Sequence, residues 1–163
     1  MNLRIFPLHT GVWKGTYTRI AADGTVMWSH KSSIFQHLDG KEWRQTNQYD
    51  FPSGKREFHN FGLSYFDQNG ELTLDNYRIF GKSRESDKCI ILWWEFKNEP
   101  DSKLFELINL IKIGHRTRVW QHTSNGVFEG ITMIEEWKIA EQNTIDLSHF
   151  DQASYINQAQ FSI

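Results

Sequence analysis

The feature of this sequence that most limits its fold is a turn signal that returns at regular spacing. Residue pairs such as Asp23-Gly24, Asn69-Gly70 and Asn125-Gly126 favour the backbone conformations of tight hairpin turns. Successive signals lie about 11 to 17 residues apart, which suits antiparallel strands joined by short connections. The same kind of signal occurs at Asp39-Gly40, Ser53-Gly54, Ser86-Asp87, Asn98–Asp101 and Gly114.

The segments between these turns are rich in aromatic and β-branched residues and predict ten strands. Ten sequential strands must protect their edges, and closure into a barrel does so directly. We therefore predict an all-β fold, a ten-stranded antiparallel up-and-down barrel. The predicted strands are Gly11–Ile20, Val26–Leu38, Glu42–Phe51, Arg56–Phe66, Glu71–Asp75, Asn76–Ser83, Lys88–Phe96, Leu104–Lys112, His115–Thr123 and Val127–Ile139.

The two ends of the chain depart from this strand pattern. We place the barrel in residues 1–139, with a short helix within residues 2–9 that would cap one end of it. Residues 103–112 also suit a helical period, but the strands on both sides of them favour a strand. Residues 140–163 are rich in Asn, Gln, Ser and Asp. We interpret them as a polar tail, disordered or laid over the barrel.

Charge and composition exclude several classes of protein. The chain has 18 Lys and Arg against 20 Asp and Glu, a net charge of −2, so it lacks the positive surface that nucleic acids or anionic membranes require. Its longest apolar run, residues 89–94, is too short to span a membrane. Cys89 is the only cysteine, which excludes an internal disulfide. The N-terminus has no secretory pattern, and we expect a cytoplasmic protein.

The first predicted strand opens with Gly11-Val12-Trp13-Lys14-Gly15-Thr16-Tyr17. A Gly-x-Trp at the start of a strand meander resembles the signature of the calycin superfamily, which includes lipocalins and fatty-acid-binding proteins. In calycins the Trp closes the barrel floor and an Arg from a late strand lies across its indole ring. The resemblance implies this barrel-closing role for Trp13, with Arg116 and Arg118 as the candidate arginines. It also implies a small-molecule cavity.

Further strings are similar to an uncharacterised bacterial calycin-like family. They are Gly11-Val-Trp-Lys-Gly-Thr-Tyr-Thr-Arg19, His30-Lys-Ser32, Gln45-Thr-Asn47 and Glu135-Glu-Trp137. The resemblance covers roughly residues 9–139. Cousins with comparable barrels include the S-type phycobilin lyases, which chaperone a linear tetrapyrrole, and nitrobindin, which holds haem. Such a resemblance implies the fold and a cavity, and it leaves the ligand open.

Alternation along a late strand places Arg116, Arg118 and Trp120 on one face. If that face points inward, each guanidinium needs a carboxylate or a ligand anion, because an unpaired buried charge is costly. Glu106 and Glu136, on neighbouring strands, could supply the carboxylates. Alternatively, the two arginines anchor an anionic ligand. A resemblance supports this alternative. Arg118-Val-Trp120 resembles the Arg-x-Tyr pair that binds a carboxylate in fatty-acid-binding proteins, with Trp replacing Tyr.

The clearest alternation lies in residues 42–51, where Trp43, Gln45, Asn47 and Tyr49 share one face. The opposite face is plainly polar. The amides in the middle of the inner face could hydrogen-bond a carbonyl or hydroxyl group of a bound molecule. They could equally hold a cluster of water inside the barrel.

Other candidate ligand-binding residues are aromatic. Tyr17 could polarise a ligand carbonyl, and His30 is the candidate axial ligand if the barrel holds haem. No cofactor is predicted, with haem or a bilin as the alternatives, and no metal site is predicted because the histidines lack metal-ligand spacing. Four tryptophans could stack on a conjugated ligand or pack as ordinary core: Trp28, Trp43, Trp94 and Trp120.

Three hypotheses of function follow. The first is a binding protein for a small lipophilic or aromatic molecule, which could carry an acidic group. The second is an isomerase, cyclase or chromophore lyase, in which Glu136 or His30 would move a proton. The third is a barrel filled by its own aromatic side chains, 15% of the chain, that acts as an interaction domain. Residues 140–163 would then contact a protein partner or a second copy. An inward arginine left unpaired by protein would favour the first.

Overall fold

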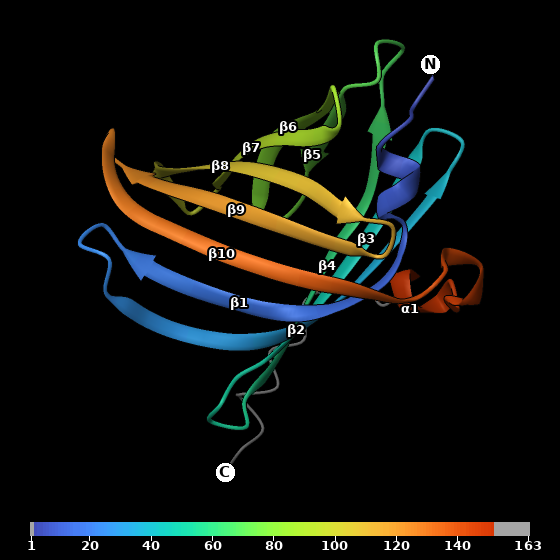
Figure 1. The fold of residues 1–163 in the computed structure, drawn as a ribbon. Coiled ribbons are helices and arrows are strands. Elements are labelled where there is room, and N and C mark those ends of the chain that lie inside the picture. The colour runs from blue at the N-terminus through green and yellow to red at the C-terminus, as the bar shows by residue number, and fades with distance from the viewer. Residues whose placement is uncertain (1, 152–163) are drawn as a thin grey trace.

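In a computed structural model, which describes residues 2–151, the chain forms a closed barrel of ten antiparallel strands (Figure 1). Each strand pairs with its neighbours in sequence, and the first closes on the last, so the fold class predicted above is confirmed. The strands are β1 (Gly11–Ala21), β2 (Val26–Asp39), β3 (Glu42–Asp50), β4 (Arg56–Phe66), β5 (Leu72–Asp75), β6 (Ile79–Ser86), β7 (Cys89–Phe96), β8 (Glu99–Lys112), β9 (His115–Ser124) and β10 (Val127–Ala140).

Two predicted boundaries are corrected by the structure. The segment Asn98–Asp101 was expected to be a turn, but β8 already begins at Glu99. Pro100 is tolerated there because the pairing with β7 shifts register between Phe96 and Glu95, which leaves Pro100 outside the regular ladder. The strand expected from Asn76 begins only at Ile79. The Asn76 side chain caps that turn by accepting hydrogen bonds from the backbone N–H groups of Arg78 and Ile79.

One end of the barrel is closed by the N-terminal segment. The helix expected within residues 2–9 is a single 3-10 turn, η1 (Phe6–His9), that carries Pro7 in its first turn. A carboxylate oxygen of Glu85 accepts hydrogen bonds from the backbone N–H groups of Ile5 and Phe6 at 2.6 and 2.8 Å. The Phe6 ring then packs into an apolar cluster with Trp43, Phe66, Leu72, Ile90 and Ile108.

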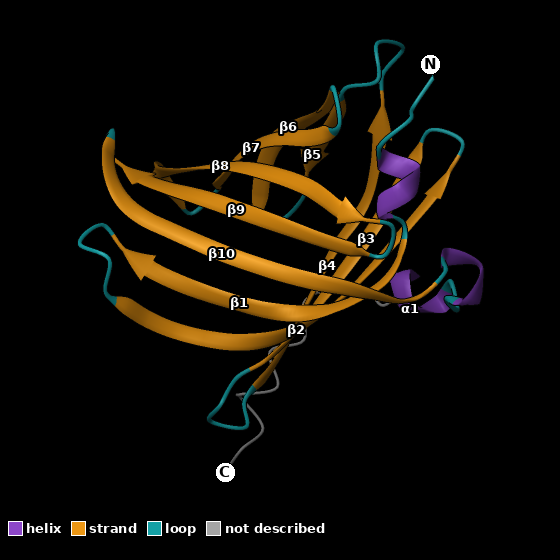
Figure 2. Cartoon of the chain, in the orientation of Figure 1, coloured by secondary structure: helices purple, strands orange, loops and turns teal. Residues whose placement is uncertain are grey.

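The segment after β10 lies on the outside of the barrel. It forms the 3-10 turn η2 (Gln142–Thr144) and one helical turn, α1 (Ser148–Asp151) (Figure 2). The Gln142 side chain accepts a hydrogen bond from the backbone N–H of Leu38. The backbone carbonyl of the buried Phe150 accepts a hydrogen bond from the side-chain amide of Asn60. These contacts hold the segment against β2 and β4, and the remainder of the predicted tail lies outside the described residues.

The wall of the barrel is weakest between β4 and β5. Only two residue pairs join these strands, Tyr65 with Thr73 and Phe66 with Leu72, both near the closed end. Toward the opposite end side chains bridge the gap, as when Asn76 donates a hydrogen bond to the carbonyl of Phe61. None of the helices in residues 2–151 is long and apolar enough to cross a membrane.

Candidate functional site

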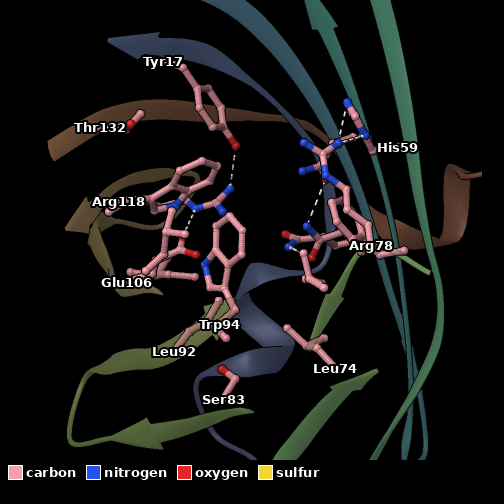
Figure 3. A pocket seen from close by; sticks show the side chains of 18 of the residues that line it. Tyr17, His59, Leu74, Arg78, Ser83, Leu92, Trp94, Glu106, Arg118 and Thr132 are labelled. Atoms are coloured by element: carbon pink, nitrogen blue, oxygen red, sulfur yellow. Dashed lines mark hydrogen bonds and ion pairs between the residues drawn. The ribbon is translucent and has the colours of Figure 1, made fainter. Parts of the chain in front are cut away.

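The barrel encloses a cavity of about 350 Å³ (Figure 3). Alternation along the strands creates it, because every second side chain points inward, and most of those side chains are aromatic or aliphatic. All ten residues predicted to bind a ligand line it: Tyr17, Trp28, His30, Trp43, Gln45, Asn47, Tyr49, Arg116, Arg118 and Trp120. Their inward direction is thereby established, and their role in binding stays a prediction.

The floor of the cavity is built around Trp13. Its indole is fully buried, and its N–H donates a hydrogen bond of 2.8 Å to the carbonyl of His9. The guanidinium of Arg116 lies over the indole ring, with Cζ at 4.1 Å from the ring centroid. Arg116 also forms a 2.6 Å ion pair with Glu136, and both side chains are fully buried. Arg116 is thus the late-strand arginine that covers the floor tryptophan, and its charge is balanced by protein.

Arg118 is also balanced by a buried acid. Its Nε lies 2.6 Å from a carboxylate oxygen of Glu106 on β8, and its Nη1 donates a 3.1 Å hydrogen bond to the hydroxyl oxygen of Tyr17 (Figure 3). The nearby glutamates and Tyr17 raise the pKa of Arg118 despite the opposing effect of burial. The carboxylate partners considered from sequence, Glu106 and Glu136, therefore do face the two arginines. Glu106, and not a ligand, supplies the carboxylate that balances Arg118.

A row of polar side chains crosses the wall from β2 along β3. Arg116 donates to the Gln36 carbonyl oxygen at 2.8 Å, and the Gln36 amide donates to Gln45 at 2.9 Å. Gln45 donates to Asn47 at 3.0 Å, and Asn47 to the Tyr49 hydroxyl oxygen at 2.8 Å. These amides are thus linked to one another, in addition to any water or ligand they contact. The Tyr49 hydroxyl oxygen accepts the final bond, which leaves its proton available as a donor.

Stacked aromatic rings form much of the remaining wall. The His30 ring stacks between Tyr17 and Trp28, at centroid distances of 5.0 and 5.2 Å. Trp120 meets Tyr17 and Trp94 edge to face, each at 5.3 Å. The buried indole N–H of Trp120 has no hydrogen-bond partner among the described residues. Such an orphaned donor beside a cavity is the kind of group that a ligand or water satisfies.

Three residues at the end opposite η1 were not among the sequence candidates. Arg78, in the turn before β6, lines the cavity with its guanidinium over the ring of Phe96, Cζ lying 5.1 Å from the centroid. Arg78 also contacts His59 of β4, on the side of the cavity opposite Arg118 and Glu106 (Figure 3). The sequence pattern places Arg78 within the predicted strand Asn76–Ser83 and does not single it out. In the structure Arg78 lies in the turn before β6, where alternation does not assign an inward or outward direction.

Burial sets the protonation of the cavity side chains. It raises the pKa of both Tyr17 and Tyr49 above the usual tyrosine value, so both phenols stay protonated and can donate hydrogen bonds. Burial, then the positive charges of Arg116, Arg118 and Lys138, lowers the pKa of His9 to about 2. Burial followed by Arg78 lowers the pKa of His59 to about 4. His9 at the floor and His59 at the opposite end of the cavity, its mouth, are therefore neutral at neutral pH.

The structure does not test the cofactor predictions. No group of three or more His, Cys, Asp or Glu side chains within residues 2–151 is arranged to hold a metal ion. Burial lowers the pKa of His30, and its Nδ1 lies 3.1 Å from the carbonyl oxygen of Lys31. That contact and the stacked rings fix the imidazole in place. Whether it binds haem or a bilin stays a prediction.

Solved structures of two proteins share the fold at low sequence identity. A protein of unknown function from the DUF3598 family of Nostoc punctiforme matches with a TM-score of 0.62 and 14% identity, over 85% of this chain and 50% of that protein. Rv2717c from Mycobacterium tuberculosis matches with a TM-score of 0.56 and 14% identity, over 82% of this chain and 93% of that protein. The chain thus spans about half the length of the Nostoc protein.

Comparison with curated proteins finds no match. A family model does match, and it covers residues 1–141, which include the whole barrel and the floor residues Trp13, Arg116 and Glu136. The family is described as a domain of unknown function, DUF3598, N-terminal. Since this match covers most of the chain, the protein belongs to the DUF3598 family through that family's N-terminal domain.

Proposed function

We propose that this protein binds a small, largely apolar molecule in the barrel cavity. The observation that carries the proposal is the cavity of about 350 Å³, whose apolar and aromatic walls are interrupted by a few polar groups. Sites for small molecules have this composition, with apolar walls for affinity and a few polar atoms for orientation. A barrel filled by its own aromatic side chains would lack such a space, so the cavity favours the binding hypothesis over the filled-barrel one.

The cavity has a cost that packing alone does not explain. Each unfilled volume in a core forgoes dispersion contacts and lowers stability, by about 24 cal/mol per Å³ when the space is apolar. Larger side chains at small inward positions such as Ser64 and Ser83, both buried and lining the cavity, would fill it. A chain that keeps these positions small retains the space at the expense of stability, which supports a function for it.

The calycin resemblance supports the same proposal. The Trp13 indole on the barrel floor, covered by Arg116 from a late strand, is the arrangement that the resemblance implies. We propose on this basis that the DUF3598 N-terminal domain is calycin-like. A cytoplasmic location and the kinship with phycobilin lyases remain proposals of the same kind.

Binding can be tested with phenylnaphthylamine, a neutral apolar dye whose fluorescence rises in apolar surroundings. The wild-type protein should bind it saturably. Ser83→Phe places a ring inside the cavity and should abolish binding, whereas Ser53→Phe, in an exposed turn, should leave it unchanged. Circular dichroism of each variant checks the fold. Equal binding by wild type and both variants would place the dye outside the barrel and overturn the proposal.

Native mass spectrometry of protein purified from its own host supplies an independent test. A small molecule that remains bound to the barrel would identify the occupant, and an absorbance spectrum would show whether it is a conjugated chromophore. The Ser83→Phe variant purified in the same way should lack the bound mass. Retention of that mass by the filled variant would contradict binding in the cavity.

An enzyme that acts on a lipophilic substrate is the second candidate, and one contact favours it. Arg118 donates a hydrogen bond to the Tyr17 hydroxyl oxygen at 3.1 Å, which polarises the phenol and makes its proton a stronger donor toward a substrate carbonyl. His30, stacked on Tyr17, is the nearest candidate for moving a proton, whereas Glu136 is held in the ion pair with Arg116. Recovery of a bound host molecule chemically changed after incubation would favour an enzyme, and recovery unchanged would favour a carrier.

A further inference from the structure

We propose that Arg78 binds the acidic group of the ligand, so that the protein takes organic acids with one carboxylate-type anion on an apolar body. This inference rests on the proposed function, because it needs a molecule in the cavity. It assigns the anion to a residue at the open end of the barrel and not to Arg116 or Arg118.

The two arginines deeper in the cavity are not available for a ligand anion. Arg116 pairs with Glu136 and Arg118 pairs with Glu106, each at 2.6 Å and nearly or fully buried. Nη2 of Arg116 has no hydrogen-bond partner among the described residues, but a ligand carboxylate there would be a second buried negative charge on a cation that a glutamate already neutralises, at a cost of several kcal/mol. The interior charges are therefore balanced two against two.

Arg78 has a different environment. No carboxylate among the described residues forms an ion pair with it, and its described side-chain contacts are His59 and the ring of Phe96. His59 carries no negative charge that could balance Arg78. Burial and Arg78 itself lower the pKa of His59 to about 4, so its ring is neutral at neutral pH. Arg78 is partly buried and lines the cavity, so its charge faces the bound molecule.

Two acids close to Arg78 in the fold already have cations of their own. Glu57 lines the cavity and contacts His59 Nε2 at 3.0 Å, and its other carboxylate oxygen lies 2.5 Å from the ammonium group of Lys55. Asp75, three residues before Arg78, lies 2.6 Å from Lys97. Among the described residues, the positive charge of Arg78 is therefore left without a carboxylate partner, which an anionic ligand would supply.

The position of Arg78 also indicates the shape of the ligand. Its contacts with the Phe96 ring and with His59 restrict the guanidinium, and a guanidinium can present two parallel N–H donors to a carboxylate, sulfonate or phosphate. Ile79, Trp94 and Leu104 form an apolar cluster next to it, toward the barrel interior. A ligand with its acid at Arg78 would therefore direct its apolar body inward, toward the amide row and Tyr49.

Arg78 also lies beside the weakly paired strands β4 and β5, which we take as the route by which a ligand enters. Arg78 precedes β6 and contacts His59 of β4, across the stretch where the strands are not paired. An acid that enters through this stretch would pass close to this guanidinium. Electrostatic attraction then guides the anionic end of the molecule to Arg78, where it stays bound.

Two dyes with the same apolar body test the inference. Anilinonaphthalene sulfonate carries a sulfonate, and phenylnaphthylamine is its neutral counterpart. Arg78→Gln should weaken binding of the sulfonate roughly tenfold or more, the usual effect of losing a hydrogen-bonded charge partner, and change binding of the neutral dye less than about twofold. Arg78→Lys should retain part of the preference for the sulfonate. Arg84→Gln, an exposed position on β6, is the matched control and should change neither.

The outcomes separate this inference from the proposed function. If neither dye binds the wild-type protein, the cavity proposal fails. If both bind and Arg78→Gln leaves the sulfonate affinity unchanged, or weakens both dyes equally, only the anion site at Arg78 is overturned. A salt titration of the wild-type protein gives a second readout that needs no variant. High salt should weaken binding of the sulfonate and spare the neutral dye, and equal effects on both would contradict the inference.

Discussion

The guanidinium of Arg116 lies over the indole of Trp13, with 4.1 Å between its Cζ atom and the ring centroid. The two residues come from β9 and β1, which are not adjacent, and β10 lies between them in the barrel. Nε of this guanidinium donates a hydrogen bond to the carboxylate of Glu136 on β10. The barrel floor is therefore a layer that joins three strands, and its stability depends on one buried charge.

Arg116→Met should destabilise the barrel by about 3–5 kcal/mol, because Glu136 would remain buried with only its longer contact to Arg118, at 3.5 Å. The double variant Arg116→Met/Glu136→Leu removes both charges and should regain at least half of that loss. Arg56→Met, which breaks the exposed pair with Asp50, should cost less than about 1 kcal/mol. Urea denaturation of the four proteins measures these differences. A double variant no more stable than Arg116→Met would show that stacking on Trp13, and not the ion pair, dominates.

Glu106→Gln should convert Arg118 into a second anion-binding group. The substitution keeps the shape of the side chain and removes the negative charge that lies 2.6 Å from Arg118. We expect a loss of stability of about 3 kcal/mol together with tighter binding of anilinonaphthalene sulfonate, measured by fluorescence titration. Binding of the neutral dye should not change. Unchanged sulfonate affinity would show that Arg118 is too enclosed to reach a ligand.

Gly15→Ala should disturb the floor through a steric clash. A Cβ atom at this position would lie 2.0 Å from the Glu135 carbonyl oxygen and 2.6 Å from Cγ of Glu136. Strand β10 would have to move, and with it the ion pair to Arg116, at a cost of about 2–3 kcal/mol. Gly24→Asn, in an open turn with nothing within 4 Å of the new Cβ, is the control. Thermal denaturation compares the two, and equal melting temperatures would contradict the close approach.

Acid should unfold the protein through its buried histidines. Burial, followed by Arg78 for one and Arg19 for the other, lowers the pKa of His59 and His122 from 6.5 to about 4. The unfolded chain takes up these protons as the pH falls below 6.5, while the folded protein does not. Stability is therefore full above pH 6.5 and declines toward pH 4, by up to about 1.4 kcal/mol per pH unit for each group.

His122→Asn should make that decline shallower. Asn can keep a hydrogen bond to Thr132, which His122 contacts at 2.8 Å, but it binds no proton. Urea denaturation at a series of pH values gives the slope for wild type and variant. Identical slopes would show that His122 does not contribute, and a wild-type stability that stays constant across this pH window would contradict the effect of burial on both histidines.

Local sequence patterns predicted much of the barrel correctly. Alternation in Glu42–Phe51 placed Trp43, Gln45, Asn47 and Tyr49 on the inner face, and all four line the cavity. The same reasoning put Arg116, Arg118 and Trp120 on one face, and the structure shows that this face points inward. It works because the side chains of a strand alternate strictly, so one buried residue fixes the direction of its neighbours. The predictions were wrong at Pro100, which lies in β8 and not in the expected turn, and at Arg78, which lies in a turn and not in the expected strand.

By itself the sequence determined the ten strands, their order and which side chains of a strand share a face, because turn chemistry and alternation act over a few residues. Only the tertiary structure decided which inward charges are balanced. Glu106 and Glu136 reach Arg118 and Arg116 at 2.6 Å, whereas no described carboxylate pairs with Arg78. Those distances depend on barrel closure and on the register between strands far apart in the chain. An ion pair changes with a shift of a few ångströms, and the spacing of residues along one strand does not specify such a shift.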